Sequence, residues 1–138
     1  MKKLLLTLTV ATLILAGCEK DKPSFVTSKE SLVGTYRLTA VTVNNVNVFN
    51  NANDDLNLFE PCDRDNQMKL NADESYQLMD AGVACNPSSS DSGTWNFVNA
   101  TSLKVDGDPV TINSFDGKTL VISESFSGAT MITTMQKQ

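Results

Sequence analysis

From Ser31 onward the chain is divided into short segments in which apolar and polar residues alternate. Gly, Pro, Asn and Asp separate these segments, and no run at helical spacing extends beyond a few residues. Alternation with a period of two places the apolar side chains on one face of a strand. The pattern predicts an all-β domain with strands at Ser31–Val43, Gln67–Asn71, Ser75–Met79, Gly93–Val98, Ser102–Asp106, Val110–Phe115, Thr119–Glu124 and Thr130–Gln136.

The apolar faces of these strands define the expected interior of the domain. In the first strand the residues of this face are Leu32, Gly34, Tyr36, Leu38 and Ala40. The later strands contribute Met68 with Leu70, Tyr76 with Leu78, Trp95 with Phe97, Leu103 with Val105, Val110 with Ile112, and Leu120 with Ile122.

The turn sequences favour antiparallel pairing of consecutive strands. Asp106-Gly107-Asp108-Pro109 and Asp116-Gly117 are typical of tight hairpin turns. Closing eight such strands into an up-and-down β-barrel removes exposed sheet edges. We therefore expect an eight-stranded antiparallel barrel, with a β-sandwich as the alternative.

Two longer connections occupy residues 44–64 and 80–92. In the first of them, Asn53 or Asp54 is placed to cap a short helix that ends at Phe59.

The first residues have the features of a bacterial lipoprotein signal. Lys2 and Lys3 precede an apolar run from Leu4 to Leu15, which is too short to span a bilayer but suits a signal peptide. The run closes with Leu15-Ala16-Gly17-Cys18, the pattern that lipoprotein-processing enzymes recognise. We predict that residues 1–17 are removed.

Cleavage before Cys18 would make this cysteine the first residue and the site of lipidation with acyl chains such as palmitate. Two or more chains anchor a protein stably. Residues 18–30 are then a flexible tether and residues 31–138 the folded domain. The expected location is the bacterial cell envelope, on the periplasmic or the outer face of the outer membrane.

Cys62 and Cys85 remain as an even pair in an oxidising compartment, which predicts a disulfide between them. It would close a loop of about 24 residues and contribute about 3–4 kcal/mol on the chain-entropy model. A metal site is disfavoured because the chain has no His and no third free thiol.

Charge and composition disfavour two classes of function. Once Lys2 and Lys3 are removed, nine basic residues face sixteen acidic ones and the formal charge falls from −5 to −7, so nucleic acid is not an expected partner. The absence of His removes the usual general base and the common nucleophile pairs. We expect a protein that is not an enzyme and that uses no cofactor.

Two segments resemble a known family. Leu32-Val33-Gly34-Thr35-Tyr36-Arg37-Leu38 resembles the first-strand Gly-x-Trp-x-Leu pattern of lipocalin-like lipoproteins, with Tyr36 in place of Trp. Cys62-Asp63-Arg64-Asp65-Asn66, through Cys85 to Gly93-Thr94-Trp95, resembles the central part of the bacterial lipocalin-like domain family. The resemblance covers about residues 30–136. The META-type β domains open on a similar strand, but this chain lacks their Gly-Cys-Asn motif.

The resemblance implies a barrel whose interior accepts a small hydrophobic molecule. The candidate ligand-binding residues are Tyr36, Leu38, Met68, Tyr76, Trp95 and Phe97. The same side chains can instead fill the barrel as a packed core. In that case the loops at residues 44–55 and 86–91 are candidates for recognising an envelope protein or a glycan.

Overall fold

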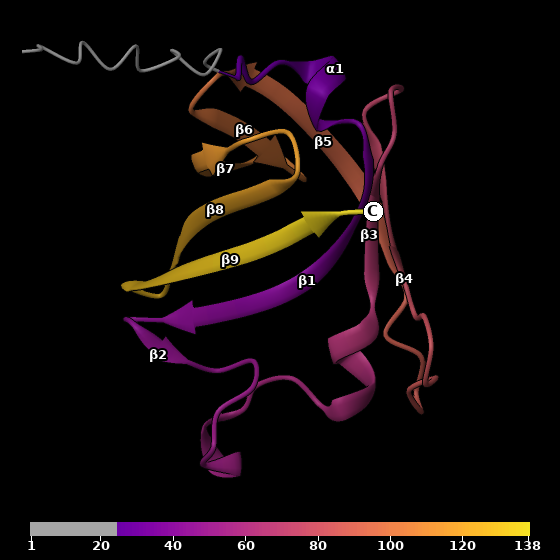
Figure 1. Ribbon diagram of the computed structural model, residues 1–138, viewed down its shortest axis with the longest axis vertical. Coiled ribbons are helices and arrows are strands. Elements are labelled where there is room, and N and C mark those ends of the chain that lie inside the picture. The colour runs from indigo at the N-terminus through magenta and orange to yellow at the C-terminus, as the bar shows by residue number, and fades with distance from the viewer. Residues whose placement is uncertain (1–24) are drawn as a thin grey trace, which may run out of the picture.

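The computed structural model describes residues 25–138, which form one antiparallel sheet closed into a barrel (Figure 1). The predicted signal at residues 1–17, the predicted lipidation site Cys18 and the first part of the tether lie outside the described residues. The elements are α1 (Lys29–Leu32), β1 (Gly34–Val43), β2 (Val46–Asn47), the 3-10 turns η1 (Asp54–Leu56) and η2 (Pro61–Asp65), β3 (Gln67–Leu70), β4 (Ser75–Met79), β5 (Asp91–Asn99), β6 (Ser102–Val105), β7 (Asp108–Phe115), β8 (Thr119–Phe126) and β9 (Ala129–Lys137).

The barrel consists of β1 and β3 to β9, each paired antiparallel with its neighbours. The order is β1-β3-β4-β5-β6-β7-β8-β9, and β9 pairs with β1 to close the ring. The two-residue β2 pairs with the end of β1 outside the ring. The eight-stranded up-and-down barrel predicted from the sequence is confirmed, and the sandwich alternative is wrong.

Tight turns join the later strands as predicted. Asp106 and Gly107 both have positive φ, 50° and 90°, and they connect the paired residues Val105 and Asp108. This is the geometry of a two-residue hairpin turn whose twist matches that of the flanking strands. Ser127 and Gly128, which were not singled out as a turn from the sequence, connect β8 to β9 in the same way.

The chain enters the barrel through a helical turn that sequence periodicity did not predict. Ser28 and Ser31 form a reciprocal capping box, in which each side chain accepts a hydrogen bond from the other residue's backbone N–H. Ser31 and Leu32 therefore belong to α1 and not to the first strand, which begins at Gly34. Lys29 and Glu30, assigned to the tether, belong to α1 as well. Within residues 25–138, no helix has the length and apolar character needed to cross a membrane.

Two β-bulges change which residues face the interior. In β1 the pairing with β9 shifts between Leu38 and Ala40, so Thr39 is the extra residue and Val41, 1% exposed, turns inward in place of the predicted Ala40. In β7 a second shift at Asn113 lets both Ile112 and Phe115 point inward. An alternating pattern cannot reveal a bulge, because one inserted residue inverts every later position.

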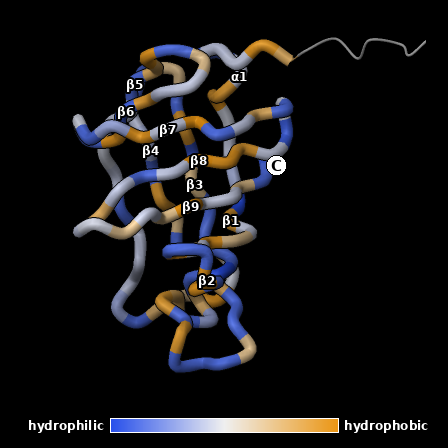
Figure 2. The backbone as a smooth tube through the Cα atoms, turned by 90° about the vertical axis from the view of Figure 1, so that its left-hand side faces the viewer, coloured by the Kyte–Doolittle hydropathy of each residue, from blue (hydrophilic) through white to orange (hydrophobic). Residues whose placement is uncertain are grey.

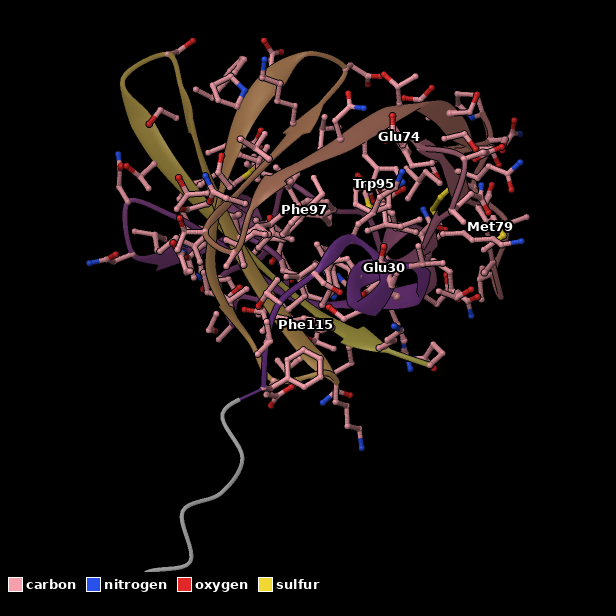
Figure 3. The ribbon with its side chains drawn as sticks, turned by 90° about the horizontal axis from the view of Figure 1, so that it is seen from above. Glu30, Glu74, Met79, Trp95, Phe97 and Phe115 are labelled. Atoms are coloured by element: carbon pink, nitrogen blue, oxygen red, sulfur yellow. A yellow bond between two sulfur atoms is a disulfide. The ribbon has the colours of Figure 1, made fainter. Side chains whose placement is uncertain are left out.

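The two ends of the barrel differ. Side chains fill the end beneath α1, where Leu32, Tyr36 and Trp95 are fully buried in the main core cluster. The view from above shows Trp95 and Phe97 within the ring of strands, with Glu30 on α1 (Figure 3). At the opposite end lie β2, η1, η2 and the β4–β5 connection, where apolar segments recur among the polar loops (Figure 2). Any internal site must therefore lie towards the loop end.

Candidate ligand-binding site

Hydrogen bonds fix α1 as a plug over the packed end. The Tyr36 hydroxyl donates to the backbone oxygen of Leu32 at 2.7 Å, and the Lys137 ammonium donates to that of Ser31 at 2.7 Å. The indole Nε1 of Trp95 donates to the backbone oxygen of Asn71 at 3.0 Å. Each buried aromatic thus has a partner for its polar group. Burial raises the pKa of the Tyr36 hydroxyl, so it stays a neutral donor.

A second hydrogen-bond group links β4, β5 and the β6–β7 turn. The carboxylate of Asp106 accepts from the Tyr76 hydroxyl at 2.8 Å and from the backbone N–H of Thr94 at 2.8 Å. These bonds lower the pKa of Asp106 below its usual value, and the bond from Thr94 has the larger effect. Desolvation and the bond to Asp106 raise the pKa of Tyr76 to about 12. Both oxygens of the Asp106 carboxylate accept a bond from within the protein, so we assign the group a structural role.

The loop end of the barrel contains a cavity of about 410 Å³. Pockets for small molecules commonly span about 300–1,000 Å³ and have mostly apolar walls with a few polar groups. The cavity fits that description, since most of its lining is aliphatic, Met or Phe. It is lined by Leu38, Val41, Leu58, Phe59, Asp63, Asn66, Met68, Leu78, Ser89, Val105, Val110, Ile122, Glu124, Met131, Thr133 and Met135.

The long strands β1, β8 and β9 build one wall through their inward positions. Along β9 these are Met131, Thr133 and Met135, which pair with Val43, Val41 and Leu38 of β1. The bulge at Thr39 allows both Leu38 and Val41 to face inward, and it therefore shapes the wall. Short strands opposite contribute Met68, Leu78 and Val105.

A small apolar cluster in the β1–β3 connection covers part of the mouth. Phe49 and Phe59 pack edge to face with ring centroids 5.4 Å apart, and Phe49 and Val48 are buried against Val41. The backbone N–H of Leu58 donates to the backbone oxygen of Val48 at 2.8 Å. The Leu58 side chain is 70% exposed although it lines the cavity, which places it on the rim.

A disulfide between Cys62 and Cys85 joins this connection to the one between β4 and β5, and it confirms the predicted pairing. The Cα atoms are 5.4 Å apart. Beside it the amide of Asn66, only 5% exposed, donates to the Ser89 hydroxyl at 2.6 Å and accepts from the Ala81 backbone N–H at 3.2 Å. Both loops at the mouth are therefore cross-linked covalently and by buried hydrogen bonds.

Two carboxylates are the charged groups in the cavity lining. Glu124 follows Leu120 and Ile122 at alternate positions of β8, so its half-buried side chain falls on the inner face, opposite Met131. Asp63 lies in η2 and accepts from the Glu60 backbone N–H at 3.1 Å and the Asn66 amide at 3.5 Å. Of the described residues that line the cavity, none is Lys or Arg.

The six residues predicted to bind a ligand divide between the two halves of the barrel. Leu38 and Met68 line the cavity. Tyr36, Tyr76 and Trp95 lie in the packed core, and Phe97 packs against that core. The two interpretations of the interior, packed core or cavity, therefore apply to different ends of the same barrel. Contact of a ligand with any of these residues stays a prediction.

Several lining residues were not singled out from the sequence. Strict alternation along the first strand puts Val41 on the outer face, and only the bulge at Thr39 turns it inward. Phe59 lies in a segment without alternation. Glu124 was assigned to a predicted strand, and its position four residues after Leu120 is the signal that could have placed it on the inner face.

The described residues contain one group of metal-ligating atom types, Cys62, Asp63 and Cys85, within 4.8 Å of one another. The two sulfur atoms are bonded to each other, so they are not available as thiolate ligands.

Comparison with known proteins adds one match. A family model described as a lipocalin-like domain matches residues 32–122, from α1 to the middle of β8. No curated protein and no solved structure matches the chain.

Proposed function

Because this chain belongs to the lipocalin-like domain family, we propose that it binds one small hydrophobic molecule in the loop end of its barrel. The observation that carries the proposal is the cavity of about 410 Å³ with aliphatic, Met and Phe side chains over most of its wall. Burial of an apolar molecule there would gain about 25 cal/mol for each Å² removed from water. Met68, Met131 and Met135 suit such a site because thioether side chains adapt to irregular shapes.

The function is a binding function and not a catalytic one. The chain contains no His, and the carboxylate of Asp63 is engaged in closing the η2 turn. A carrier needs an apolar wall and a mouth, both of which lie at the loop end.

The proposal is tested by titrating the protein with a neutral fluorescent apolar probe such as N-phenyl-1-naphthylamine. We expect one site per chain and a blue-shifted emission. Thr133→Phe places a ring in the middle of the cavity from β9 and should reduce probe affinity by at least tenfold. Thr134→Phe, on the outer face of the same strand, is the matched control and should bind as the wild type does. Equal binding by both variants would place the probe elsewhere and overturn the proposal.

We propose that the carrier acts while anchored to the outer membrane through lipid on Cys18. The support is the sequence Leu15-Ala16-Gly17-Cys18 after a short apolar run. Radiolabelled palmitate should be incorporated into the wild type expressed in a Gram-negative host and not into Cys18→Ser. Equal labelling of both proteins, or labelling of neither, would contradict anchoring at this residue.

A second candidate function is recognition of an envelope protein or a glycan by the loops at the mouth. The observation that favours it is exposed apolar surface on those loops, at Leu56, Leu58 and Val83, which are 43%, 70% and 68% exposed. Such a function predicts that Leu56→Ser with Val83→Ser abolishes partner capture and leaves probe binding intact, because neither residue lines the cavity. Capture that is unaffected by the double change would exclude these loops.

A further inference from the structure

We infer that the cavity selects amphiphiles whose head group is a cation, and that it disfavours fatty acids and other anionic amphiphiles. The inference rests on the proposed function and adds the charge class of the ligand. It follows from the position and sign of the charged groups in the cavity lining.

The apolar wall and the charged groups are separated along the barrel. Met135 and Val110 lie at the deep end, where they also belong to the packed core. Asp63 and Glu124 lie nearer the mouth: Asp63 belongs to the loop segment η2, and Glu124 comes four residues after the core residue Leu120. An apolar tail inserted into the barrel would thus leave its head group in the part of the cavity that the two carboxylates line.

Neither carboxylate is neutralised by a basic side chain. Within residues 25–138 one ion pair is present, between Lys29 and Glu74, and it lies at the opposite end of the barrel from Asp63 and Glu124. Arg64 follows Asp63, but its guanidinium donates to the Phe59 backbone oxygen at 3.3 Å and to Asn50 at 3.4 Å, and it does not line the cavity. No hydrogen-bond donor reaches the Glu124 carboxylate from the described residues, so a ligand group can take that position.

The charge arrangement discriminates between ligands of equal length. A carboxylate ligand would add a third negative charge to the cavity that Asp63 and Glu124 line, whereas an ammonium group would add a charge of opposite sign. The net charge of the chain, −5, also attracts cationic ligands and repels anionic ones over longer distances. Glu124 lies beyond the segment matched by the family model, so the inference concerns this chain and not the family as a whole.

The test compares three ten-carbon ligands, decylamine, decanol and decanoate, by calorimetric titration of the full protein at pH 7 and low salt, below their aggregation concentrations. We expect affinity to fall in that order, with decylamine about tenfold tighter than decanoate. The difference should narrow when salt is raised, because screening weakens partly exposed charge interactions.

Glu124→Gln keeps the shape of the side chain and should reduce the ratio of decylamine to decanoate affinity about threefold, leaving decanol unchanged. Asp63→Asn, which keeps an acceptor oxygen for the η2 turn, should act in the same direction. The matched control is Glu30→Gln, which removes the same charge from α1 at the opposite end of the barrel and should leave the ratio unchanged.

The outcomes separate the two claims. Decanoate binding as tightly as decylamine, or a Glu124→Gln ratio equal to that of the wild type, would overturn the charge selectivity while binding of decanol would still support the carrier function. Failure of all three ligands, decanol included, would overturn the carrier function and the selectivity with it.

Discussion

Gly93 shows how a single residue holds one side of the barrel. The Tyr76–Asp106 group crosses β5 at this position, and a Cβ atom added to Gly93 would lie 2.6 Å from Cε1 of the Tyr76 ring. Gly93→Ala should therefore lower the free energy of unfolding by about 1–3 kcal/mol, as overpacking does. Urea unfolding measures this free energy, and Ser92→Ala, at the exposed neighbouring residue, is the control. Equal stability of the two variants would contradict the close packing at Gly93.

Asp106 gives the same group a dependence on pH. Its pKa is lowered in the folded protein by the Thr94 and Tyr76 bonds, so its stabilisation is complete above the unfolded-state pKa of about 3.8. It is lost as the pH falls through the lower, folded-state pKa. Asp106→Asn should be less stable than the wild type at pH 7, and the difference should shrink below about pH 4. A difference that stays constant from pH 7 to pH 2 would rule out this contribution.

At the scale of elements, the two loops at the mouth depend on their cross-link. The bond between Cys62 and Cys85 spans a sequence separation of 23 and joins two connections that are otherwise linked by side-chain hydrogen bonds such as those of Asn66. Cys62→Ser and Cys85→Ser should each lower the free energy of unfolding by about 3 kcal/mol. Thermal melting checks the effect, and dithiothreitol should shift the wild type but neither variant. A melting temperature unchanged in both variants would contradict a structural role.

Elements with a local sequence signal could be predicted, whereas those that depend on tertiary contacts could not. Strands β3, β4 and β6 to β9 follow from alternation and turn residues, which act locally, and ring closure follows from the cost of free edges. The capping box at Ser28, the hairpin at Asn44-Asn45 and the bulge at Thr39 have weak local signals and depend on tertiary contacts. Alternation placed Leu78, Val105, Val110 and Ile122 of the cavity wall in the interior, but of the residues named as ligand contacts only Leu38 and Met68 line the cavity. Which half of a barrel is packed depends on how its ends are closed, and local patterns do not reveal this.

The whole molecule is a barrel with a structural end and an open end. Beneath α1, large aromatic side chains fill the interior, and the side chains of Tyr36 and Lys137 donate hydrogen bonds to backbone oxygens of α1. From Met135 towards the loops, the interior is lined mostly by aliphatic and Met side chains, with Phe59 at the loop end, and two cross-linked loops border the mouth. Under the proposed function, the packed end serves stability and the open end serves binding, so changes in the cavity should alter probe affinity more than the free energy of unfolding.

Native mass spectrometry of the protein after incubation with a lipid extract of bacterial envelopes would test the binding function most directly. We expect one discrete added mass per chain, which Thr133→Phe abolishes and Thr134→Phe retains. A bare protein mass, under conditions in which a known lipid-binding protein is loaded, would contradict a hydrophobic carrier and point to the loops as the functional surface.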